Sequence, residues 1–377
     1  MTTGGHKALR QPLAARAVQA GSLPVAGDGE PKLQWLEAGR GVAALLVTLL
    51  HVANMMALPQ YSGRVALGGI FEHGYLGVDF FFVLSGFIIL FVNRHHAGRP
   101  AHLGSYALRR FTRIFPTYWV VLALALLVNQ TLQRSKAPLT ADWVVQQALL
   151  ITPAAPWLGP AWTLQHELLF YVVFALALAS VRLGAVAVAA WIAAVLATAA
   201  LVPPTFWSQP QWLSKLLHPY SLHFVVGMLI AYVYPKPRAL RRVSAVLLAA
   251  GLGCAALYVY GLERAPAALF LRYLAAALAF GGVLGGLLLI EARGIRPPPG
   301  LAGLGTVSYA LYLIHVLPSG YLFAALVRLR WYHVLPQWAL FGLTVALCVA
   351  AAVVIHRMVE LPAIGLGKRI DRRLRAA

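Results

Sequence analysis

Long apolar stretches alternate with short polar segments over most of the chain. A helix needs about 20 largely apolar residues to cross the hydrocarbon core of a bilayer, and a window of that length predicts ten spans. The predicted spans cover residues 41–58, 75–93, 116–132, 161–180, 185–203, 219–234, 243–262, 266–290, 304–326 and 337–356. The pattern therefore predicts an all-α fold, a polytopic integral membrane helix bundle of about ten transmembrane helices.

These spans follow one another at short spacing, so we expect one membrane domain and no soluble domain of appreciable size. We predict a membrane-embedded domain over residues 33–362. A flexible basic cytoplasmic tail over residues 1–32 precedes it, and a basic cytoplasmic tail over residues 363–377 follows it. The first 40 residues contain no short apolar core with a small-residue cleavage site, so we expect no cleavable signal peptide and assign the insertion signal to the first span.

The composition excludes several other classes of protein. Of the 377 residues, 60% are hydrophobic and only 11% are charged, whereas soluble domains carry about 25% charged residues. A soluble enzyme, a disordered chain and a collagen-like fibre are therefore excluded. The formal net charge of +20 does not indicate nucleic-acid binding, because the basic residues form short clusters between apolar runs.

The positions of the basic residues predict the orientation in the membrane. With the amino terminus in the cytoplasm, 23 of the 31 Lys and Arg residues fall on cytoplasmic segments and 7 on outer segments, while Arg272 lies within a span. Cytoplasmic loops of membrane proteins carry an excess of Lys and Arg. We therefore expect both termini to be cytoplasmic.

Neither the cysteines nor the short motifs indicate a metal centre. Cys254 and Cys348 lie inside apolar runs, which is typical of small buried apolar residues rather than of a disulfide or a metal pair. The chain has no HExxH, GxSxG or Walker motif and no Cys/His cluster with metal-ligand spacing. We expect no metal cofactor.

Ionisable side chains within the spans are the candidates for function, because each costs roughly 2.5–3.5 kcal/mol at the centre of a membrane helix. Arg40 lies at the inner mouth of the first span. His51 follows 11 residues later, about 16 Å along a helix, near the middle of the bilayer. Histidine suits proton transfer near neutral pH. The alternative is a ring that only bonds to a backbone carbonyl of a neighbouring helix.

Two carboxylates are predicted inside spans. Asp79 precedes three phenylalanines, and Glu167 lies a few residues from the outer start of the fourth span. Glu167 and His51 are expected at comparable depths, so they could meet, and a carboxylate bonded to an imidazole fixes its tautomer and stabilises its charged form. The alternatives are an Asp79 that pairs with a buried Arg or His, and a Glu167 that only stabilises a helix start.

The densest basic segment at a predicted membrane edge is SYALRRFTRIFPTYW. It contains Arg109, Arg110 and Arg113, followed by Pro116, which can begin a helix. Arg110 and Arg113 are three residues apart and share a face if the segment is helical. Arginine binds phosphate through two parallel hydrogen bonds, so this is a candidate phosphate site that opens to the cytoplasm. The alternative is an anchor that contacts lipid headgroups.

A polar stripe is predicted on one face of the ninth span. Ser308, Tyr309, Tyr312 and His315 supply three hydroxyls and an imidazole. Tyr312 and His315 are three residues apart, so their side chains share a face of the helix. A stripe of this kind lines a cavity more often than it faces lipid.

Three other ionisable residues have simpler explanations. His223 and Arg272 are expected to join helices to one another, and Glu360, after the last span, is expected to pair with the nearby Arg357. The residues alone thus predict a buried histidine and two buried carboxylates above a basic mouth. That arrangement is typical of either proton-coupled transport or group transfer within the membrane.

Five motifs together resemble the acyltransferase family 3 membrane proteins, the group that O-acetylates surface polysaccharides. In chain order they are LQWLEAGRGVAALLVTLLH, GYLGVDFFFVLSGFIIL, YALRRFTRIFPTYW, WTLQHELLFY and SYALYLIH. The resemblance extends from about residue 33 to about residue 362. The chain departs from the family pattern at Glu37 and Ala38, at His166, and at Pro318, which follows His315 by three residues.

The resemblance implies a membrane O-acetyltransferase of the bacterial inner membrane, similar to the stand-alone exopolysaccharide enzymes. It implies acetyl-CoA as the donor and a polysaccharide or lipid-linked saccharide as the acceptor. His51 would be the general base, oriented by Glu167 or Asp79, and Arg40 would stabilise charge on the donor or hold the helix register. The implied contacts are Arg109, Arg110 and Arg113 with the donor phosphates, and Trp162, Tyr309, Tyr312 and His315 with the substrate.

Two alternatives stay open. An acetyl-histidine intermediate could replace direct transfer to the acceptor. A proton-coupled transporter or flippase could use His51, Asp79 and Glu167 as a proton relay. Two similar halves with paired broken helices would favour a transporter, and the sequence shows no such halves.

Overall fold

The computed structural model describes residues 33–61, 63, 66–132, 139–259, 268–330, 332 and 334–376, so the predicted tail over residues 1–32 lies outside it. The described residues form helices and contain no strand. The long helices are α2 (Gln34–Met56), α3 (Leu76–Asn93), α4 (Leu103–Leu132), α6 (Trp162–Ala179), α7 (Val181–Leu201), α9 (Tyr220–Val233), α10 (Pro237–Leu257), α11 (Ala268–Ala292) and α15 (Gln337–Ile355). The other α-helices are α5 (Ala141–Ala148), α8 (Trp212–Leu216), α12 (Pro299–Thr306), α13 (Ser308–Ile314), α14 (Val316–Arg328) and α16 (Leu361–Ala376).

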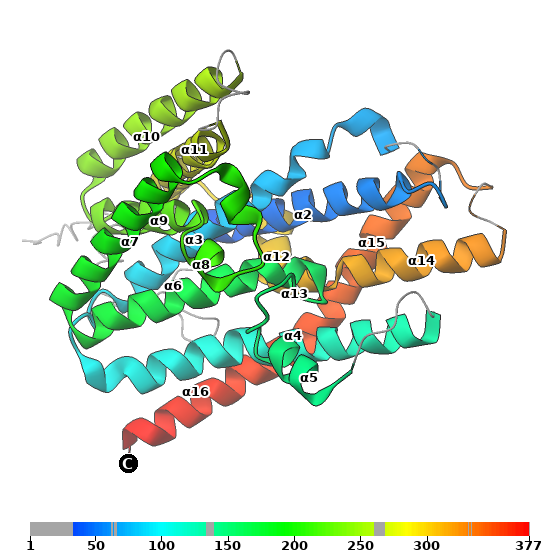
Figure 1. Cartoon of the computed structure of the whole chain (residues 1–377), viewed down its shortest axis with the longest axis horizontal. Helices are drawn as coiled ribbons and strands as arrows, with labels where there is room; N and C mark the ends of the chain where they lie inside the picture. Colours follow the sequence, from blue (N-terminus) through cyan, green and yellow to red (C-terminus); the bar gives the residue numbers. More distant parts are fainter. Residues whose placement is uncertain are drawn as a thin grey trace, which may run out of the picture.

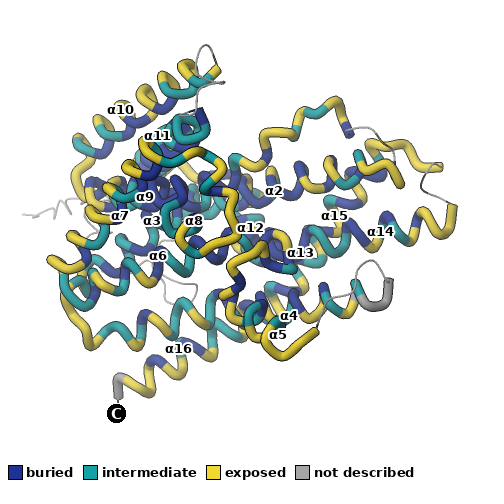
Figure 2. The backbone as a smooth tube through the Cα atoms, in the orientation of Figure 1, coloured by how far each residue is buried: buried dark blue, intermediate teal, exposed yellow. Residues whose placement is uncertain are grey.

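The prediction of a polytopic helix bundle is confirmed. In the described part of the chain, nine helical segments are long and apolar enough to cross a bilayer, and the bent pair α13 and α14 can supply a tenth span. The helices lie together as one bundle (Figure 1). Its outward faces carry exposed residues, including large apolar ones such as Val186, Leu201 and Val246 (Figure 2). A surface of this kind suits lipid and not water.

The basic segment before Pro116 belongs to a membrane helix. We predicted a span that begins at Pro116, but α4 begins at Leu103 and continues through the proline. Pro116 removes one backbone hydrogen bond from the helix interior without ending the helix. The three arginines of this segment are therefore carried on a rigid helix, and Arg110 and Arg113 share a face of it as predicted.

The carboxyl-terminal segment is helical and not only a tail. α15 continues through a π-helical turn, His356–Glu360, into α16. Pro362 lies two residues after this turn and has no N–H for the helical ladder, which favours such an irregularity. α16 packs against α4, where Gly367 lets the backbone approach the side chain of Thr112.

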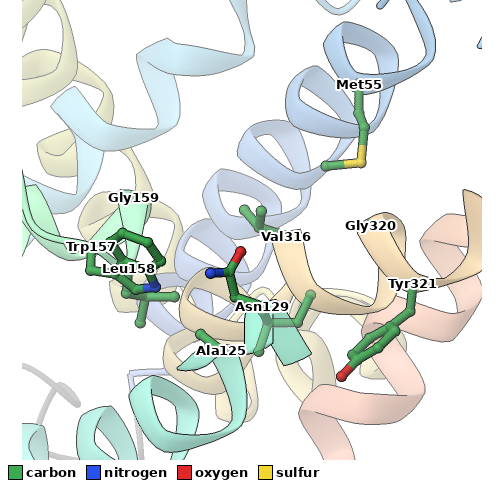
Figure 3. A pocket seen from close by; sticks show the side chains of 10 residues that line it. Met55, Ala125, Asn129, Trp157, Leu158, Gly159, Val316, Gly320 and Tyr321 are labelled. Atoms are coloured by element: carbon green, nitrogen blue, oxygen red, sulfur yellow. The ribbon is translucent and has the colours of Figure 1, made fainter. Parts of the chain in front are cut away.

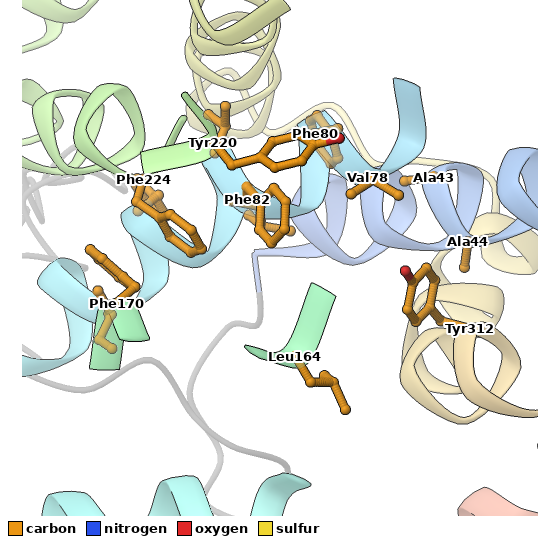
Figure 4. Packing of buried hydrophobic residues seen from close by; sticks show 14 of the residues in the cluster. Ala43, Ala44, Val78, Phe80, Phe82, Leu164, Phe170, Tyr220, Phe224 and Tyr312 are labelled. Atoms are coloured by element: carbon orange, nitrogen blue, oxygen red, sulfur yellow. The ribbon is translucent and has the colours of Figure 1, made fainter. Parts of the chain in front are cut away.

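The central core lies where α3 crosses α9. Phe82 packs on Tyr220 and Phe224, with ring centroids 4.8 Å and 5.0 Å apart (Figure 4). The two backbones meet at a glycine on each helix. A Cβ atom at Gly86 would strike the backbone of Phe224, and one at Gly227 would strike the backbone of Val83 and Phe87. Small residues at a helix crossing permit this close approach of the two backbones.

This crossing gives a prediction for stability. Gly227→Ala should destabilise the bundle by about 1–3 kcal/mol, because the added methyl meets backbone that has no room to move. Gly253→Ala on α10 is the matched control, since no heavy atom lies within 4 Å of its Cβ position. Thermal melting of the purified protein in detergent measures both variants. Equal melting temperatures for Gly227→Ala and wild type would contradict the close crossing.

α2 is the helix that organises the candidate site. It contacts α3, α12, α13, α14 and α15, helices that are far apart in the sequence. Close approach to α12 depends on Gly41, whose Cβ would meet the backbone of Leu301 and Gly305. The carboxyl-terminal half of α2 therefore faces the junction of α13 and α14.

Candidate functional site

Two histidines predicted in different spans, His51 and His315, lie side by side. Their ring centroids are 4.9 Å apart, and the ring planes make an angle of 60°. His51 is carried by α2, and His315 lies at the junction of α13 and α14. His315 is fully buried, whereas His51 is exposed. The pair thus combines one open imidazole with one enclosed imidazole.

Both rings are held through the same nitrogen. Nδ1 of His51 lies 2.8 Å from the carbonyl oxygen of Val47, and Nδ1 of His315 lies 3.1 Å from that of Leu311. A carbonyl oxygen only accepts hydrogen bonds, so each Nδ1 carries the proton and each Nε2 is an acceptor. Nε2 of His315 is buried and has no hydrogen-bond partner among the described residues. An imidazole fixed in this way can take a proton from a bound hydroxyl group.

A helix break positions His315. α13 and α14 meet there at an angle of 45°. Pro318 explains the bend, because it has no N–H for the carbonyl four residues earlier and its ring clashes with that carbonyl. The His315 carbonyl oxygen accepts hydrogen bonds from Ser319 Oγ at 2.7 Å and from Cys348 Sγ at 3.2 Å. The bond from Cys348 joins the bend to α15.

The polar stripe on α13 bonds to neighbouring segments. The Tyr309 hydroxyl donates to the carbonyl oxygen of Ile114 at 2.8 Å. The Tyr312 hydroxyl donates to the carbonyl oxygen of Pro160 at 3.2 Å and accepts from Thr163 Oγ at 3.0 Å. These two hydroxyls therefore join α13 to α4 and to the segment that precedes α6. The two tyrosine hydroxyls of the stripe therefore face neighbouring segments of the protein, and no stripe residue is among those that line the described cavity.

Asp79 pairs with His223 and not with His51. Its Oδ1 lies 2.8 Å from Nε2 of His223, and both side chains are buried. The interaction joins α3 to α9 just beyond the glycine crossing. Of the two interpretations of Asp79, a partner for a buried histidine is therefore the one that the geometry favours. The same contact confirms the prediction that His223 joins helices.

Trp162 packs in an aromatic cluster with other partners. Its ring packs against Phe82, His166 and Tyr220, with centroid separations of 6.4, 5.8 and 5.4 Å. This aromatic cluster surrounds the Asp79 pair. Of the four residues predicted to bind substrate, His315 is the one whose ring contacts His51, and the ring centroid of Tyr312 lies 6.2 Å from that of His315.

Glu167 bonds within its own surroundings. It accepts hydrogen bonds from the Tyr171 hydroxyl and, at 3.4 Å, from Ser85 Oγ. No described carboxylate bonds to the His51 ring. The carbonyl of Val47 fixes the His51 tautomer, a role that the sequence assigned to a carboxylate.

The arginines of α4 lie near the amino-terminal ends of α2 and α4, which we call the basic end. Arg109 Nη1 lies 3.0 Å from Asp371 Oδ2 of α16, and Arg113 pairs with Glu360 of the π-helical turn. Two of the three arginines predicted to bind phosphate therefore already have carboxylate partners. Glu360 is fully buried, so its pairing with Arg113 offsets a large desolvation cost.

Arg110 is the arginine of this trio without an ion pair among the described residues. Its guanidinium lies over the rings of Tyr106 and Tyr171, 5.7 Å and 5.3 Å from their centroids. Its Nε is buried and has no hydrogen-bond partner in the described part of the chain. A stacked guanidinium with unused donors is suited to a phosphate oxygen.

Arg40 and Glu360 complete the basic end. Arg40 Nη1 lies 3.0 Å from Glu37 Oε1, one turn earlier on α2, so Glu37 engages the arginine at the position where the chain departs from the family pattern. Glu360 Oε2 also lies 2.8 Å from His356 Nδ1. The predicted pairing of Glu360 with Arg357 is wrong, because Arg357 is exposed and Glu360 turns into the bundle. Arg40 lies about 16 Å from the level of His51 on α2, so it belongs with the basic end.

Nothing in the sequence indicated the role of Lys215, which counted only as a basic residue on an outer segment. Its Nζ donates to the carbonyl oxygens of Thr152 and Ala154 and to Oε1 of Gln165, at 3.2, 3.0 and 2.5 Å. This clamp holds the segment between α5 and α6. Only tertiary structure brings the three segments together.

The remaining polar groups offer no metal centre in the part of the chain that the structure describes, since no group of three or more His, Cys, Asp or Glu side chains could hold an ion there. Cys254 and Cys348 are both free thiols, as expected. Imidazole rings can transfer protons, and the arginines of the basic end, about 16 Å away along α2, can bind an anionic group.

A bundle of apolar helices that carries an imidazole pair between α2 and the junction of α13 and α14 defines a multi-pass membrane protein. Comparison with known proteins identifies its class. Residues 33–357 match the family model described as an acyltransferase domain, so the chain belongs to this family, the acyltransferase 3 membrane proteins. The resemblance inferred from the five motifs is confirmed.

Two relatives extend this assignment. Acyltransferase MdmB of Streptomyces mycarofaciens is 28% identical over 377 residues, which cover 90% of this chain and 93% of that protein. The exopolysaccharide production protein ExoZ of Rhizobium meliloti (strain 1021) is 32% identical over 260 residues, which cover 66% of this chain and 77% of the relative. No solved structure matches the chain significantly. The chain is therefore a multi-pass membrane acyltransferase.

Proposed function

We propose that the protein moves an acetyl group from cytoplasmic acetyl-CoA to a sugar hydroxyl of an exopolysaccharide or a lipid-linked saccharide, in the bacterial inner membrane. The observation that carries this proposal is the open His51 imidazole. Its Nδ1 is fixed by a backbone carbonyl, and its ring lies against buried His315. Acyl transfer to a hydroxyl group needs a base in this state. The name of ExoZ, an exopolysaccharide production protein, supports the choice of acceptor.

The arrangement supports a donor that enters at the basic end. Arg110 offers an unpaired Nε donor to a phosphate group of coenzyme A, and Arg113 and Arg40 lie nearby, each paired with a carboxylate. The pantetheine arm of the donor is long and thin, so its thioester can reach between the helices toward His51. The sequence-based orientation, with the amino terminus inside, turns this end to the cytoplasm, where acetyl-CoA is made.

In the proposed step, Nε2 of His51 accepts the proton of the acceptor hydroxyl while its oxygen attacks the thioester carbonyl carbon. The new C–O ester bond forms, the C–S bond breaks, and the thiolate of coenzyme A leaves. The imidazolium of His51 then returns the proton to that thiolate. His315 Nε2 is available to accept a hydrogen bond from the imidazolium or from the hydroxyl.

The carboxylates have supporting roles in this proposal. Glu167 accepts a hydrogen bond from Tyr171, the ring on which Arg110 stacks. Glu167 therefore positions Arg110, the arginine proposed to bind acetyl-CoA. Asp79 fixes α9 against α3 through His223. Neither is needed to orient His51, because Val47 does so. Removing Glu167 should therefore impair donor binding more than the proton-transfer step.

Binding of coenzyme A tests the proposal against the transporter alternative. Titration calorimetry should detect binding of acetyl-CoA to the purified protein in detergent. In a separate transfer assay, labelled acetyl groups from acetyl-CoA should appear as esters on polysaccharide. If the protein binds no acetyl-CoA and forms no ester, but transports a saccharide together with protons across proteoliposome membranes, the transporter alternative is correct and the proposal is wrong.

Arg110→Ala gives a prediction for the donor site. We expect the affinity for acetyl-CoA to fall about 10- to 150-fold, because a hydrogen bond to a charged group contributes roughly 1.5–3 kcal/mol. Arg99→Ala is the matched control, since Arg99 is exposed outside the helices. Calorimetry measures both, and equal loss in the two variants would indicate a general charge effect and not a site at Arg110.

A further inference from the structure

A cavity of about 330 Å³ lies by the carboxyl-terminal end of α2 and the start of α14, and Figure 3 shows the residues that line it. Met55 on its wall is one helical turn after His51 on α2, and Val316 directly follows His315. The cavity is lined by Met55, Ala125, Asn129, Trp157, Leu158, Gly159, Val316, Leu317, Gly320 and Tyr321. The residues predicted to bind substrate, Trp162, Tyr309, Tyr312 and His315, are not among these ten.

We propose that this cavity binds the acceptor, and that the acceptor group it takes is a neutral sugar ring. This inference rests on the proposed function and adds the class of the acceptor and the residues that hold it. Trp157 and Tyr321 offer aromatic rings, Asn129 offers an amide, and none of the ten lining residues is charged. A sugar ring presents C–H groups on its faces and hydroxyls at its edge, which matches aromatic walls with a few polar groups.

Size and charge narrow the ligand further. Ligand sites of proteins measure about 300–1,000 Å³, so this cavity is at the lower end and suits one ring rather than a stretch of polymer. Without a cationic lining residue, the carboxylate of an acidic sugar would lose its hydration with no compensation. The cavity therefore selects against uronic acids and phosphorylated sugars.

The segment that carries Trp157 is held rigidly. Gln165 Nε2 donates to the carbonyl oxygens of Leu150 and Thr152 at 3.1 Å and 2.7 Å. The backbone N–H of Trp157 donates to Gln147 Oε1 at 2.8 Å. The Lys215 clamp described above adds three further bonds on the same segment and on Gln165. Such a wall is organised before the ligand arrives, so little ordering entropy is lost on binding.

The same segment is connected to the histidine pair. Pro160 follows Trp157 by three residues, and its carbonyl oxygen accepts the Tyr312 hydroxyl. Tyr312 lies three residues before His315 on the same face of α13. The position of a sugar that stacks on Trp157 is therefore fixed relative to His315, whose ring contacts the His51 ring. We assign Lys215 as a positioning residue for this wall.

Kinetics with soluble acceptors test the inference. The purified full chain in detergent is given labelled acetyl-CoA and, in turn, methyl β-glucoside, methyl β-galactoside, methyl β-glucuronide or 1-octanol. We expect a neutral glycoside to be acetylated with a lower KM than the glucuronide or octanol. Trp157→Ala should raise the KM for the neutral glycoside about tenfold, with kcat and the KM for acetyl-CoA unchanged. Lys215→Met should give the same split, with partial recovery in Lys215→Arg.

Two further variants keep the test independent of folding. Trp157→Phe retains an aromatic wall and should stay within about threefold of wild type. Trp338→Ala removes an exposed tryptophan of α15 and should change nothing. A wild-type KM in Trp157→Ala, or octanol competing where glycosides do not, overturns the inference. A wild-type protein that binds acetyl-CoA but uses no neutral glycoside overturns it too, whereas no binding of acetyl-CoA overturns the proposed function itself.

Discussion

We expect His51→Ala to lower the rate of acetyl transfer by about 10²–10⁴-fold, the range that a general base contributes. The variant loses the Nε2 lone pair that accepts the acceptor proton, while the backbone of α2 and the donor site stay in place. We therefore expect kcat to fall with little change in the affinity for acetyl-CoA. Single-turnover measurements with saturating acetyl-CoA separate the two quantities.

Matched variants define what a positive result means. His73→Ala removes a histidine that is exposed outside the bundle and pairs only loosely with Glu72, so its activity should equal that of wild type. His315→Ala should also be impaired, because the ring behind His51 is lost. If His51→Ala transfers acetyl groups at the wild-type rate, the base is another residue, and His315 is the next candidate.

Arg113→Met is expected to have the largest effect on stability. Glu360 is fully buried, and its partners are Arg113 and His356. Removing one partner of a buried ion pair costs roughly 3–5 kcal/mol, because a charge is left without compensation, and the remaining His356 places this case near the lower value. Thermal melting in detergent measures the loss.

A second substitution distinguishes this cause from a general loss of packing. In Arg113→Met/Glu360→Leu no buried charge remains, so most of the lost stability should return. Activity should not return with it, because the double variant still lacks the Arg113 guanidinium at the proposed donor entrance. A double variant that melts no higher than Arg113→Met would show that the pair does not account for the instability.

The fold was largely predictable because hydropathy alone determines which segments can cross a bilayer. The predicted helix boundaries were least accurate near prolines. Pro116 sits inside α4 where a helix start was expected, and Pro318 divides the ninth span at His315. Each effect follows from the missing N–H of proline, but whether a helix bends, continues or breaks depends on the helices packed around it.

The individual site residues were more predictable than their partners. His51, His315 and Arg110 stood out because ionisable groups at membrane depth need a reason. The contacts of the site residues could not be predicted in the same way. Arg113 and Glu360, for example, form a pair although they are 247 residues apart in the chain. Nearby sequence favoured Arg357 as the partner of Glu360, and depth alone favoured Glu167 as the partner of His51.

The residues that line the cavity, and the lysine that holds its wall, were the hardest to identify from the sequence. Trp157 and Asn129 lie in ordinary polar or apolar surroundings along the chain, and the cavity that they line forms only when α2, α4 and α14 converge. Lys215 resembled any basic residue of an outer segment. Its clamp depends on carbonyl oxygens, which the sequence does not distinguish from one another.

The most direct test of the account is transfer itself. Wild type and His51→Ala are expressed at equal membrane levels in a host that lacks surface acetylation, and ester-linked acetyl groups on the purified surface polysaccharide are counted by NMR. We predict acetyl esters with wild type and none above background with His51→Ala. Equal acetylation by both proteins, or unmodified polysaccharide from a wild-type protein that binds no acetyl-CoA, would contradict it.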